Sequence, residues 1–290
     1  MEKEVEKRRG EKMKQILKVV SLCNLVFIVL MFFFLGRNGI YFFQYYSFSD
    51  FFFGRQWISL SNIYGILPLL TGTFLVGTVA LVLSLFFSFF TIIFMAEYAS
   101  PKVRTVFKIA IEMMSAIPSV VLGFIGLYVF GDVIQSFFEL NTGFTALTGG
   151  IMLAFMAIPT IVSVSDDAFQ SLDSSYREAS IALGASRLET VLYILFPAAF
   201  PGIFAAIMLG FGRILGETLV VLMVTGNSPI VTLSILSPVR TLTATIAAEM
   251  GEVVQGSEHY YALFSIGLLL FLVSFFINGI ASRSIRRSKR

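Results

Sequence analysis

Cysteine and histidine each occur only once in the 290 residues, as Cys23 and His259. A single cysteine excludes a disulfide or a paired-thiolate metal site within one chain. The sequence also lacks a His-Glu metal spacing and the glycine-lysine pattern of a Walker A loop. We therefore predict that the chain is not an enzyme, that it holds no metal or cofactor, and that any ATP hydrolysis takes place in a partner.

Charged residues are also scarce, at 13% of the chain against 57% hydrophobic residues. Soluble domains carry about twice that share of charge. We count about six apolar runs that reach the roughly 20 residues needed to cross a bilayer. They lie near 16–36, 67–95, 107–131, 147–165, 197–225 and 260–281. Backbone polar groups must be paired in lipid, and the alternating pattern of barrel strands is absent, so the sequence predicts an all-α integral membrane protein.

The basic residues are distributed unevenly between the loops. Most of them lie in four segments: 3–18, 102–108, 177–187 and 283–290. The opposite side holds only Arg37, Arg55 and Arg240. This asymmetry fits the positive-inside rule with both termini in the cytoplasm. The basic ends are favoured as anchors at the anionic inner leaflet over nucleic-acid arms, so membrane lipid is an expected partner and nucleic acid is not.

The runs and loops divide the chain into three predicted parts. Residues 1–66 contain the basic N-terminus, a first membrane helix and an outer loop whose aromatic residues suit the headgroup level. The first run lacks a signal-peptide cleavage pattern, so we expect its helix to be retained. Residues 67–281 form the membrane core, and residues 282–290 form a basic cytoplasmic tail.

The outer side carries a second predicted feature. The segment 241–252 is expected to form a short helix that packs across the outer end of the bundle through Ile246, Ala247 and Met250. His259 lies near the outer end of the last run and is interpreted as an interfacial residue.

The cytoplasmic segment 166–196 has the strongest local signals outside the membrane. Ser175 and Glu178 have the spacing of a capping box, and Ser186 and Glu189 have the same spacing. Gly184 lies between them and can end the first helix with a positive φ. The sequence therefore predicts a short helix, a glycine turn and a second helix.

One face of this short helix carries a smooth apolar stripe, made of Ala179, Ala182 and Leu183. An exposed stripe of this kind implies a partner surface. A helix resting on lipid is the alternative, but it would usually carry larger apolar residues and more lysine.

The stretch REASIALGASRLETVLYILFP, within residues 166–197, resembles the EAA loop of ABC-importer permeases. The matching residues are Glu178, Ala179, Gly184, Ile194 and Pro197. Ser180 and Phe196 replace an alanine and a leucine of that pattern. The resemblance implies a type I importer permease with a MetI-like bundle, located in a bacterial cytoplasmic membrane. In that family the loop is a coupling helix seated in a groove of a cytoplasmic ATPase subunit, which binds the ATP. The expected coupling residues are Glu178, Ala179, Ala182, Leu183 and Gly184.

A narrower resemblance, to the phosphate-specific permeases, runs from about Tyr64 to Asn278. It rests on the order and spacing of YGILPLLTGT, AEYASP, IEMMSAIPSVVLGFIGL, GFGRILGETLVVLMVTGNSP and PVRTLTATIAAEMGE. GET followed by apolar residues and TGN is similar to the PstC type rather than to PstA. The resemblance implies a PstA-like permease subunit, cytoplasmic ATPase subunits, an extracytoplasmic phosphate-binding protein and phosphate as partners.

Arg213 and Glu217 stand in the middle of the run 197–225. A charge at that depth costs about 2.5–3.5 kcal/mol on insertion scales. On a continuous helix the two residues share one face, where they can form an ion pair. A self-contained ion pair is one interpretation. A substrate pathway is the favoured one, because apolar residues would be more stable there and an arginine fork suits phosphate oxygens; the resemblance to phosphate permeases supports it.

Small and kinking residues surround this charged face. Gly212 and Gly216 are one turn apart, with Gly210 nearby, and such spacing lets helices pack closely. The packing partner is either a second permease subunit or another helix of this chain. Pro118 and Pro159 are expected to kink the third and fourth helices.

Three other functions compete with a phosphate importer. A membrane enzyme would need catalytic groups at one depth, and Glu112, Asp166 and Asp167 have no histidine or cysteine beside them. An ATP-independent anion channel would not need the coupling loop. A permease for another oxyanion, such as molybdate or sulfate, is the closest alternative, and the residues alone do not separate it from a phosphate permease.

Overall fold

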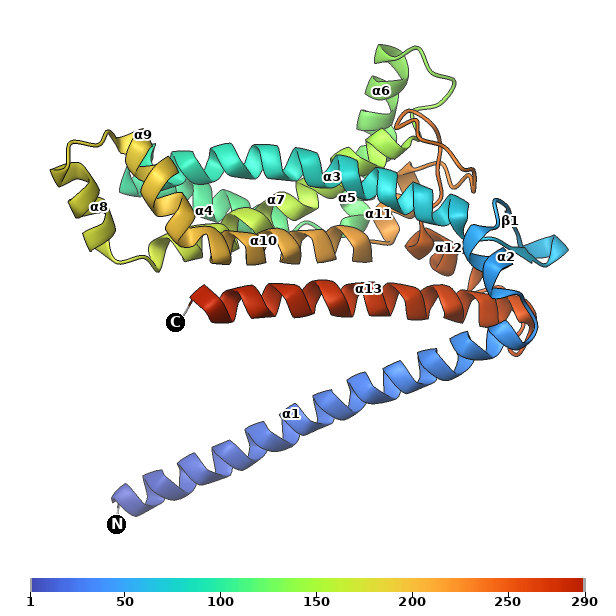
Figure 1. Ribbon diagram of the computed structural model, residues 1–290, viewed down its shortest axis with the longest axis horizontal. Helices are drawn as coiled ribbons and strands as arrows, with labels where there is room; N and C mark the ends of the chain where they lie inside the picture. Colours follow the sequence, from blue (N-terminus) through green and yellow to red (C-terminus); the bar gives the residue numbers. More distant parts are fainter. Residues whose placement is uncertain (1, 289–290) are drawn as a thin grey trace.

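The computed structural model describes the backbone of residues 2–288 and the side chains of residues 13–283. The chain is almost entirely helical (Figure 1). The first half contains α1 (Glu2–Tyr41), η1 (Phe42–Gln44), α2 (Phe48–Phe53), β1 (Trp57–Ile58), η2 (Ser59–Ser61), β2 (Ile63–Tyr64), α3 (Leu67–Ile93), η3 (Phe94–Tyr98), α4 (Pro101–Ser115), α5 (Ser119–Ile125), η4 (Gly126–Phe130) and α6 (Gly131–Phe137). The second half contains α7 (Ala146–Gln170), α8 (Ser174–Ala182), α9 (Arg187–Glu189), η5 (Thr190–Leu195), α10 (Phe196–Gly216), α11 (Leu219–Val224), α12 (Leu242–Glu249) and α13 (Glu258–Ser288).

Within the described part of the chain, six helices are long and apolar enough to cross a membrane. They are Met13–Gln44, Leu67–Tyr98, Ser119–Phe137, Ala146–Gln170, Arg187–Gly216 and Glu258–Arg283. The predicted fold class, an all-α membrane bundle, is therefore confirmed.

The helices α3, α7, α10 and α13 run along the long axis of the molecule (Figure 1). A central core fills the space between α3, α7, α10 and α11, with Val76, Leu153, Ile161, Ile214 and Val220 almost fully buried. Glycines allow close approach, because a Cβ at Gly150 of α7 would lie 2.4 Å from Val79 of α3. The pair α3–α7 thus forms the tightly packed centre of the bundle.

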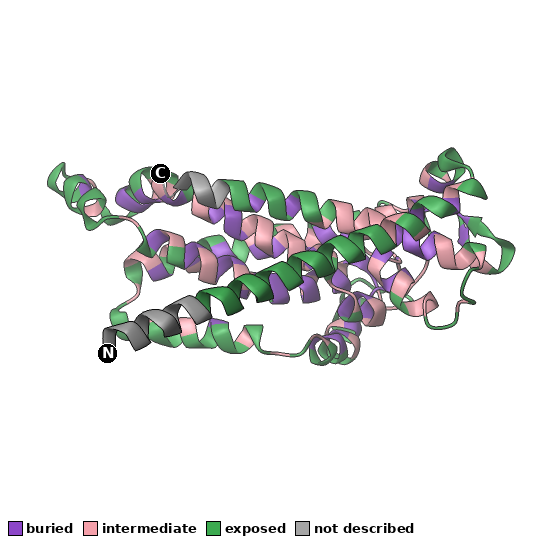
Figure 2. Ribbon diagram, turned by 90° about the horizontal axis from the view of Figure 1, so that it is seen from below, coloured by how far each residue is buried: buried purple, intermediate pink, exposed green. Residues whose placement is uncertain are grey.

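The helix α1 contacts the bundle only near its C-terminal end. There Ser265 of α13 donates to the backbone oxygen of Gly39 (2.7 Å), and Phe34 packs edge-on against Phe264. The rest of α1 diverges from α13 (Figure 1), and its apolar residues from Met13 to Phe34 are exposed (Figure 2). This surface has the composition of a helix that meets lipid or another membrane subunit.

The two ends of the bundle have different structures. One end carries α8 together with the start of α1 and the end of α13 (Figure 1). The opposite end carries the aromatic segment between α1 and α3, with the two-stranded hairpin β1–β2, and the helix α12. The start of α1, the end of α13 and α8 therefore lie at the same end of the bundle, as a topology with six spans requires.

Two of the predicted apolar runs are broken in the structure. The third run, 107–131, is not one helix, since α4 ends at Ser115 and α5 begins at Ser119. Pro118 caps α5 rather than kinking a helix, so the predicted kink is wrong. Proline disfavours the helical conformation in the residue before it, which explains the break. Pro159 does lie inside α7, as predicted.

The fifth run, 197–225, is also divided. The helix α10 ends at Gly216, Glu217 is extended (φ −72°, ψ 136°), and α11 begins at Leu219. The short helix expected in 241–252 is confirmed as α12, with Ile246 and Met250 packed on the cluster that includes Trp57 and Leu242, but Ala247 is exposed and not part of that cluster.

Candidate functional site

The loop between α7 and α10, residues 171–195, is called the α8 loop here. Its first helix is capped by Asp173, whose side chain accepts a hydrogen bond from the backbone N–H of Ser175 (2.8 Å). This bond lowers the pKa of the Asp173 carboxyl. The predicted capping box of Ser175 and Glu178 is therefore wrong. The second box is confirmed, with Ser186 and Glu189 each accepting from the backbone of the other.

The turn at Gly184 has the conformation that the sequence predicts. Its φ is +85°. Its N–H donates to the carbonyl of Ile181 (2.9 Å), and the N–H of Ala185 donates to the carbonyl of Ser180 (3.2 Å). This pair of bonds is a Schellman motif, which ends a helix at a left-handed residue. A Cβ at Gly184 would meet nothing within 4 Å, so only the backbone conformation requires glycine.

The outward face of the α8 loop is apolar and uncovered in the described structure. Leu183 is 89% exposed, Ile181 is 52% exposed, and Ala179 and Ala182 are also exposed. Glu178 lies exposed on the same short helix. The stripe predicted from the sequence therefore forms a free surface at the end of the bundle, of the kind that a protein partner covers.

The inward face of the same loop is held by polar contacts that the sequence did not predict. Ser180 and Thr190 are buried, and their hydroxyls are 3.0 Å apart. Arg177 forms an ion pair with Glu97 of η3 (Nη1 to Oε2, 2.6 Å) and donates to the carbonyl of Ala96 (3.1 Å). The sequence places Glu97 just after the apolar run 67–95. No pattern in the sequence indicates that Arg177 is its partner.

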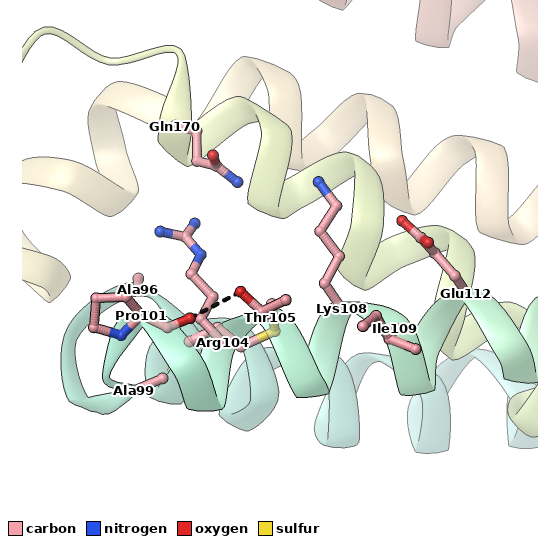
Figure 3. A pocket seen from close by; sticks show the side chains of 10 residues that line it. Ala96, Ala99, Pro101, Arg104, Thr105, Lys108, Ile109, Glu112 and Gln170 are labelled. Atoms are coloured by element: carbon pink, nitrogen blue, oxygen red, sulfur yellow. Dashed lines mark hydrogen bonds between the residues drawn. The ribbon is translucent and has the colours of Figure 1, made fainter.

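Beside this loop lies a cavity of about 550 Å³ between η3, α4 and α7 (Figure 3). Arg104 and Lys108 extend from α4 towards α7 (Figure 3). Arg104 is paired with Asp166, which is nearly fully buried, and Lys108 lies 3.6 Å from Asp167. Gln170 also donates to Asp166. The carboxylates therefore serve to attach α4 to α7.

Arg213 lies in the last turn of α10, half-buried within an apolar span. Its Nη1 donates to the hydroxyl of Thr160 on α7 (3.2 Å). Among the side chains of residues 13–283, no carboxylate lies within 4.0 Å of its guanidinium. The predicted ion pair with Glu217 is wrong, because the helix ends before Glu217 and the two residues do not share a helical face. The positive charge of Arg213 is thus left without a counter-charge among the side chains that the structure describes.

Glu217 instead holds the break between the two helices together. Its Oε1 accepts from the backbone N–H groups of Leu219 (3.0 Å) and Val220 (3.2 Å) at the start of α11. Its carbonyl accepts from the hydroxyl of Thr243 on α12 (2.8 Å). Acceptors at a helix N-terminus satisfy otherwise unpaired N–H groups. Glu217 therefore fixes the positions of α11 and α12 relative to α10.

Replacing Glu217 by alanine should destabilise this break. The lost cap should cost about 0.5–2 kcal/mol, as for other helix caps. Glu217→Gln retains the Oε1 acceptor and should unfold close to the wild-type temperature. Thermal unfolding of the purified subunit in detergent compares the two variants. Equal destabilisation by glutamine and alanine would show that the charge, not the acceptor, holds the break.

Three glycines in the second half of α10, Gly210, Gly212 and Gly216, differ in their surroundings. A Cβ at Gly210 would lie 2.5 Å from Ile161 of α7, so Gly210 forms a packing notch within this chain. At Gly212 the nearest atom would be 3.9 Å away, and at Gly216 nothing described lies within 4 Å. Of these three glycines, only Gly210 is explained by close packing against the described residues.

The end of the bundle opposite α8 has a polar centre at Glu249 of α12. Its carboxylate accepts from Trp57 Nε1 (3.0 Å), pairs with Arg240 (2.6 Å) and contacts His259 Nε2 (2.8 Å). Arg240 also donates to the carbonyl of Asn227 (3.1 Å). His259 is thus more than the interfacial residue the sequence predicted, since it helps to join the hairpin, the 226–241 loop and α13.

This geometry defines a class of protein: a multi-pass bundle with a glycine-turned helix projecting from one end is the fold of an ABC-importer permease subunit. A solved structure titled as inward-facing conformations of the MetNI methionine ABC transporter has this fold, with a TM-score of 0.55 and 18% identity. The aligned region covers 78% of this chain and 95% of the chain in that structure.

Residues 88–290 match the family model of the binding-protein-dependent transport system inner membrane component, and the chain belongs to this family. A Bacillus subtilis protein described as a probable ABC transporter permease, YqgH, is 38% identical over 264 residues, covering 89% of this chain and 85% of its own length. The phosphate transport system permease protein PstC of Haemophilus influenzae is 32% identical over 245 residues, covering 78% of this chain and 77% of its own length. PstC of Xylella fastidiosa is 31% identical over 260 residues, covering 83% and 80%.

Proposed function

We propose that the chain is the PstC-type permease subunit of an ATP-driven, high-affinity importer of inorganic phosphate. Several relatives that align over most of the chain are phosphate transport system permeases. The chain would form the translocation pathway together with a PstA-like permease subunit. A phosphate-binding protein outside the membrane would deliver the anion.

The observation that carries this proposal is that the charge of Arg213 has no counter-charge among the described side chains. A half-buried guanidinium in an apolar span is costly unless it faces a polar partner. Arginine presents five N–H donors, and one of them meets Thr160 in the described structure. The remaining donors match the planar, bidentate recognition of phosphate oxygens. Arg213 is therefore the residue proposed to meet phosphate as it crosses.

Glu217 has a different part in the proposed pathway. Since its carboxylate caps α11, it does not hold the guanidinium of Arg213. It lines a very small cavity with Thr73, Leu153 and Thr243 at the junction of α3, α7 and α12. We infer that Glu217 fixes the shape of the pathway beside Arg213. Gly212 and Gly216, which have no close neighbours among the described residues, are proposed to face the second permease subunit.

ATP coupling is proposed to act through the α8 loop. Its apolar face, Ala179, Ala182 and Leu183, would lie in a groove of the ATPase subunit, with Glu178 at the rim. Closure of the ATPase dimer on ATP would move α8 and turn the pathway from inward-facing to outward-facing. An ATP-independent channel would have no use for this surface.

The substrate is tested by competition. Cells that depend on this permease should take up labelled phosphate, and excess unlabelled phosphate should suppress that uptake far more strongly than sulfate or molybdate. Stronger competition by either of the other oxyanions would assign the permease to that anion. Uptake that persists after depletion of ATP would favour a channel.

The proposed topology places both termini and the α8 loop in the cytoplasm of a bacterial inner membrane. In a Cys23→Ala background, a cysteine at Ser186 should be protected from an impermeant reagent in intact cells. A cysteine at Leu60, which is 98% exposed at the opposite end, should be labelled. Labelling at Ser186 but not at Leu60 would mean that the orientation is reversed.

A further inference from the structure

Glu97 is a buried carboxylate at the cytoplasmic end of α3. It lies in η3, a π-helical turn that continues α3, and its side chain is only 4% exposed. Local π-helical turns are rare and are frequently found at functional sites. Removing a carboxylate from water is unfavourable unless it is paired, so the burial of Glu97 depends on its partners.

Those partners lie on both sides of the turn at Gly184. Arg177 on α8 precedes the turn and pairs with Glu97 Oε2 at 2.6 Å. Arg187 on α9 follows the turn, and its Nε lies 4.0 Å from Glu97 Oε1. A second bond from Arg177 reaches the carbonyl of Ala96. Both arms of the α8 loop are thus attached to one turn of α3.

The attachment continues into the core of the bundle. The helix α3 is packed closely on α7, where Val79 touches Gly150. The helix α7 also carries Thr160, which binds Arg213. If α8 moves while Arg177 stays paired with Glu97, the end of α3 must move with it. The helix α3 in turn contacts α7, whose Thr160 binds Arg213.

We propose that Glu97 is a positioning residue through which the α8 loop transmits the motion of the ATPase to α3 and the pathway. This inference rests on the proposed function, because it requires an ATPase on the outer face of the loop. The competing explanation is that Glu97 only holds the loop in place.

The test uses the complete transporter in liposomes and measures phosphate imported per ATP hydrolysed. The double variant Glu97→Gln with Arg177→Gln removes both charges together, so no unpaired buried charge remains. It should bind the ATPase and hydrolyse ATP like the wild type, while phosphate imported per ATP falls by about tenfold, a usual size for coupling between sites. Arg187→Gln, whose side chain is 75% exposed, should lower the ratio by only about two- to threefold, as for an exposed pair.

Asp167→Asn is the matched control, since it removes an exposed carboxylate at the same end of the bundle, and it should leave the ratio unchanged. Wild-type import per ATP by the double variant would overturn the proposal. The proposal would also be overturned if each single variant lost assembly and import and the double variant recovered both. A purely structural ion pair predicts that result. If Gly184→Val blocks import and the double variant does not, only the role of Glu97 is wrong. If neither has an effect, the coupling role of the whole loop fails.

Discussion

Arg213→Leu is expected to abolish phosphate uptake while the subunit still assembles with its partners. The structure gives Arg213 no carboxylate partner among the described side chains, so its removal leaves no unpaired buried charge. Leucine is also favourable at this depth in a membrane. Each hydrogen bond to a charged group contributes about 1.5–3 kcal/mol, so the loss of a bidentate phosphate contact should lower uptake by about 100-fold or more. Labelled phosphate uptake, normalised to the amount of assembled complex, measures the effect.

Two companion variants make the result specific to the guanidinium. Arg213→Lys keeps the charge but loses the fork, and it should retain part of the uptake. Thr160→Val removes the side-chain hydrogen bond that Arg213 makes in the described part of the chain and should have a smaller effect than Arg213→Leu. Normal uptake by assembled Arg213→Leu transporters, or by the double variant with Glu217→Leu, would show that the GRILGET stretch is only a packing element.

Gly184→Val is expected to block transport without preventing the binding protein from capturing phosphate. A positive φ of +85° is unfavourable for a β-branched residue, and such strain costs about 1–3 kcal/mol. The turn should then change conformation, and the Leu183 face should no longer fit its groove. Gly184→Asn is the matched control, because asparagine tolerates the left-handed region and a Cβ meets no neighbour there.

Uptake and ATPase co-purification should both be measured for these two variants. We expect a loss of uptake with valine and near-normal uptake with asparagine. If valine is as active as the wild type, the turn does not couple the subunits. If asparagine is as inactive as valine, the effect does not come from the backbone conformation.

Local and composition-based features of the sequence were sufficient for much of the fold. Apolar runs predicted the membrane helices because backbone pairing in lipid leaves few other structures. Gly184 and the box of Ser186 and Glu189 predicted the turn of the α8 loop, since both signals act over a few residues. The exposed stripe with Leu183 followed from helical spacing alone.

The break at Glu217 was missed because hydrophobicity does not change there. Both α10 and α11 are apolar, so the run 197–225 reads as one span. The signal that was available is Gly216 followed by Glu217 and Thr218, a helix ending and a capping acceptor in sequence. The same kind of local signal, Pro118 after Ile117, marks the break between α4 and α5.

Contacts between distant segments could not be predicted at all. Glu97, Arg177 and Arg187 become neighbours only when α3 returns to the end of the bundle that carries α8. Asp166 and Glu249 are similar cases, because each binds partners from other helices or loops. Single-sequence patterns report helix faces and caps, whereas these pairs depend on the packing of the whole chain.

The central claim is that this chain conducts phosphate under the control of an ATPase. The most direct measurement is labelled phosphate uptake into liposomes that contain the purified transporter, with the binding protein outside and ATP inside. Uptake should require ATP and the binding protein, and it should be lost with Arg213→Leu although ATP is still hydrolysed. Uptake that proceeds without ATP, or that is unchanged by Arg213→Leu, would contradict the central claim.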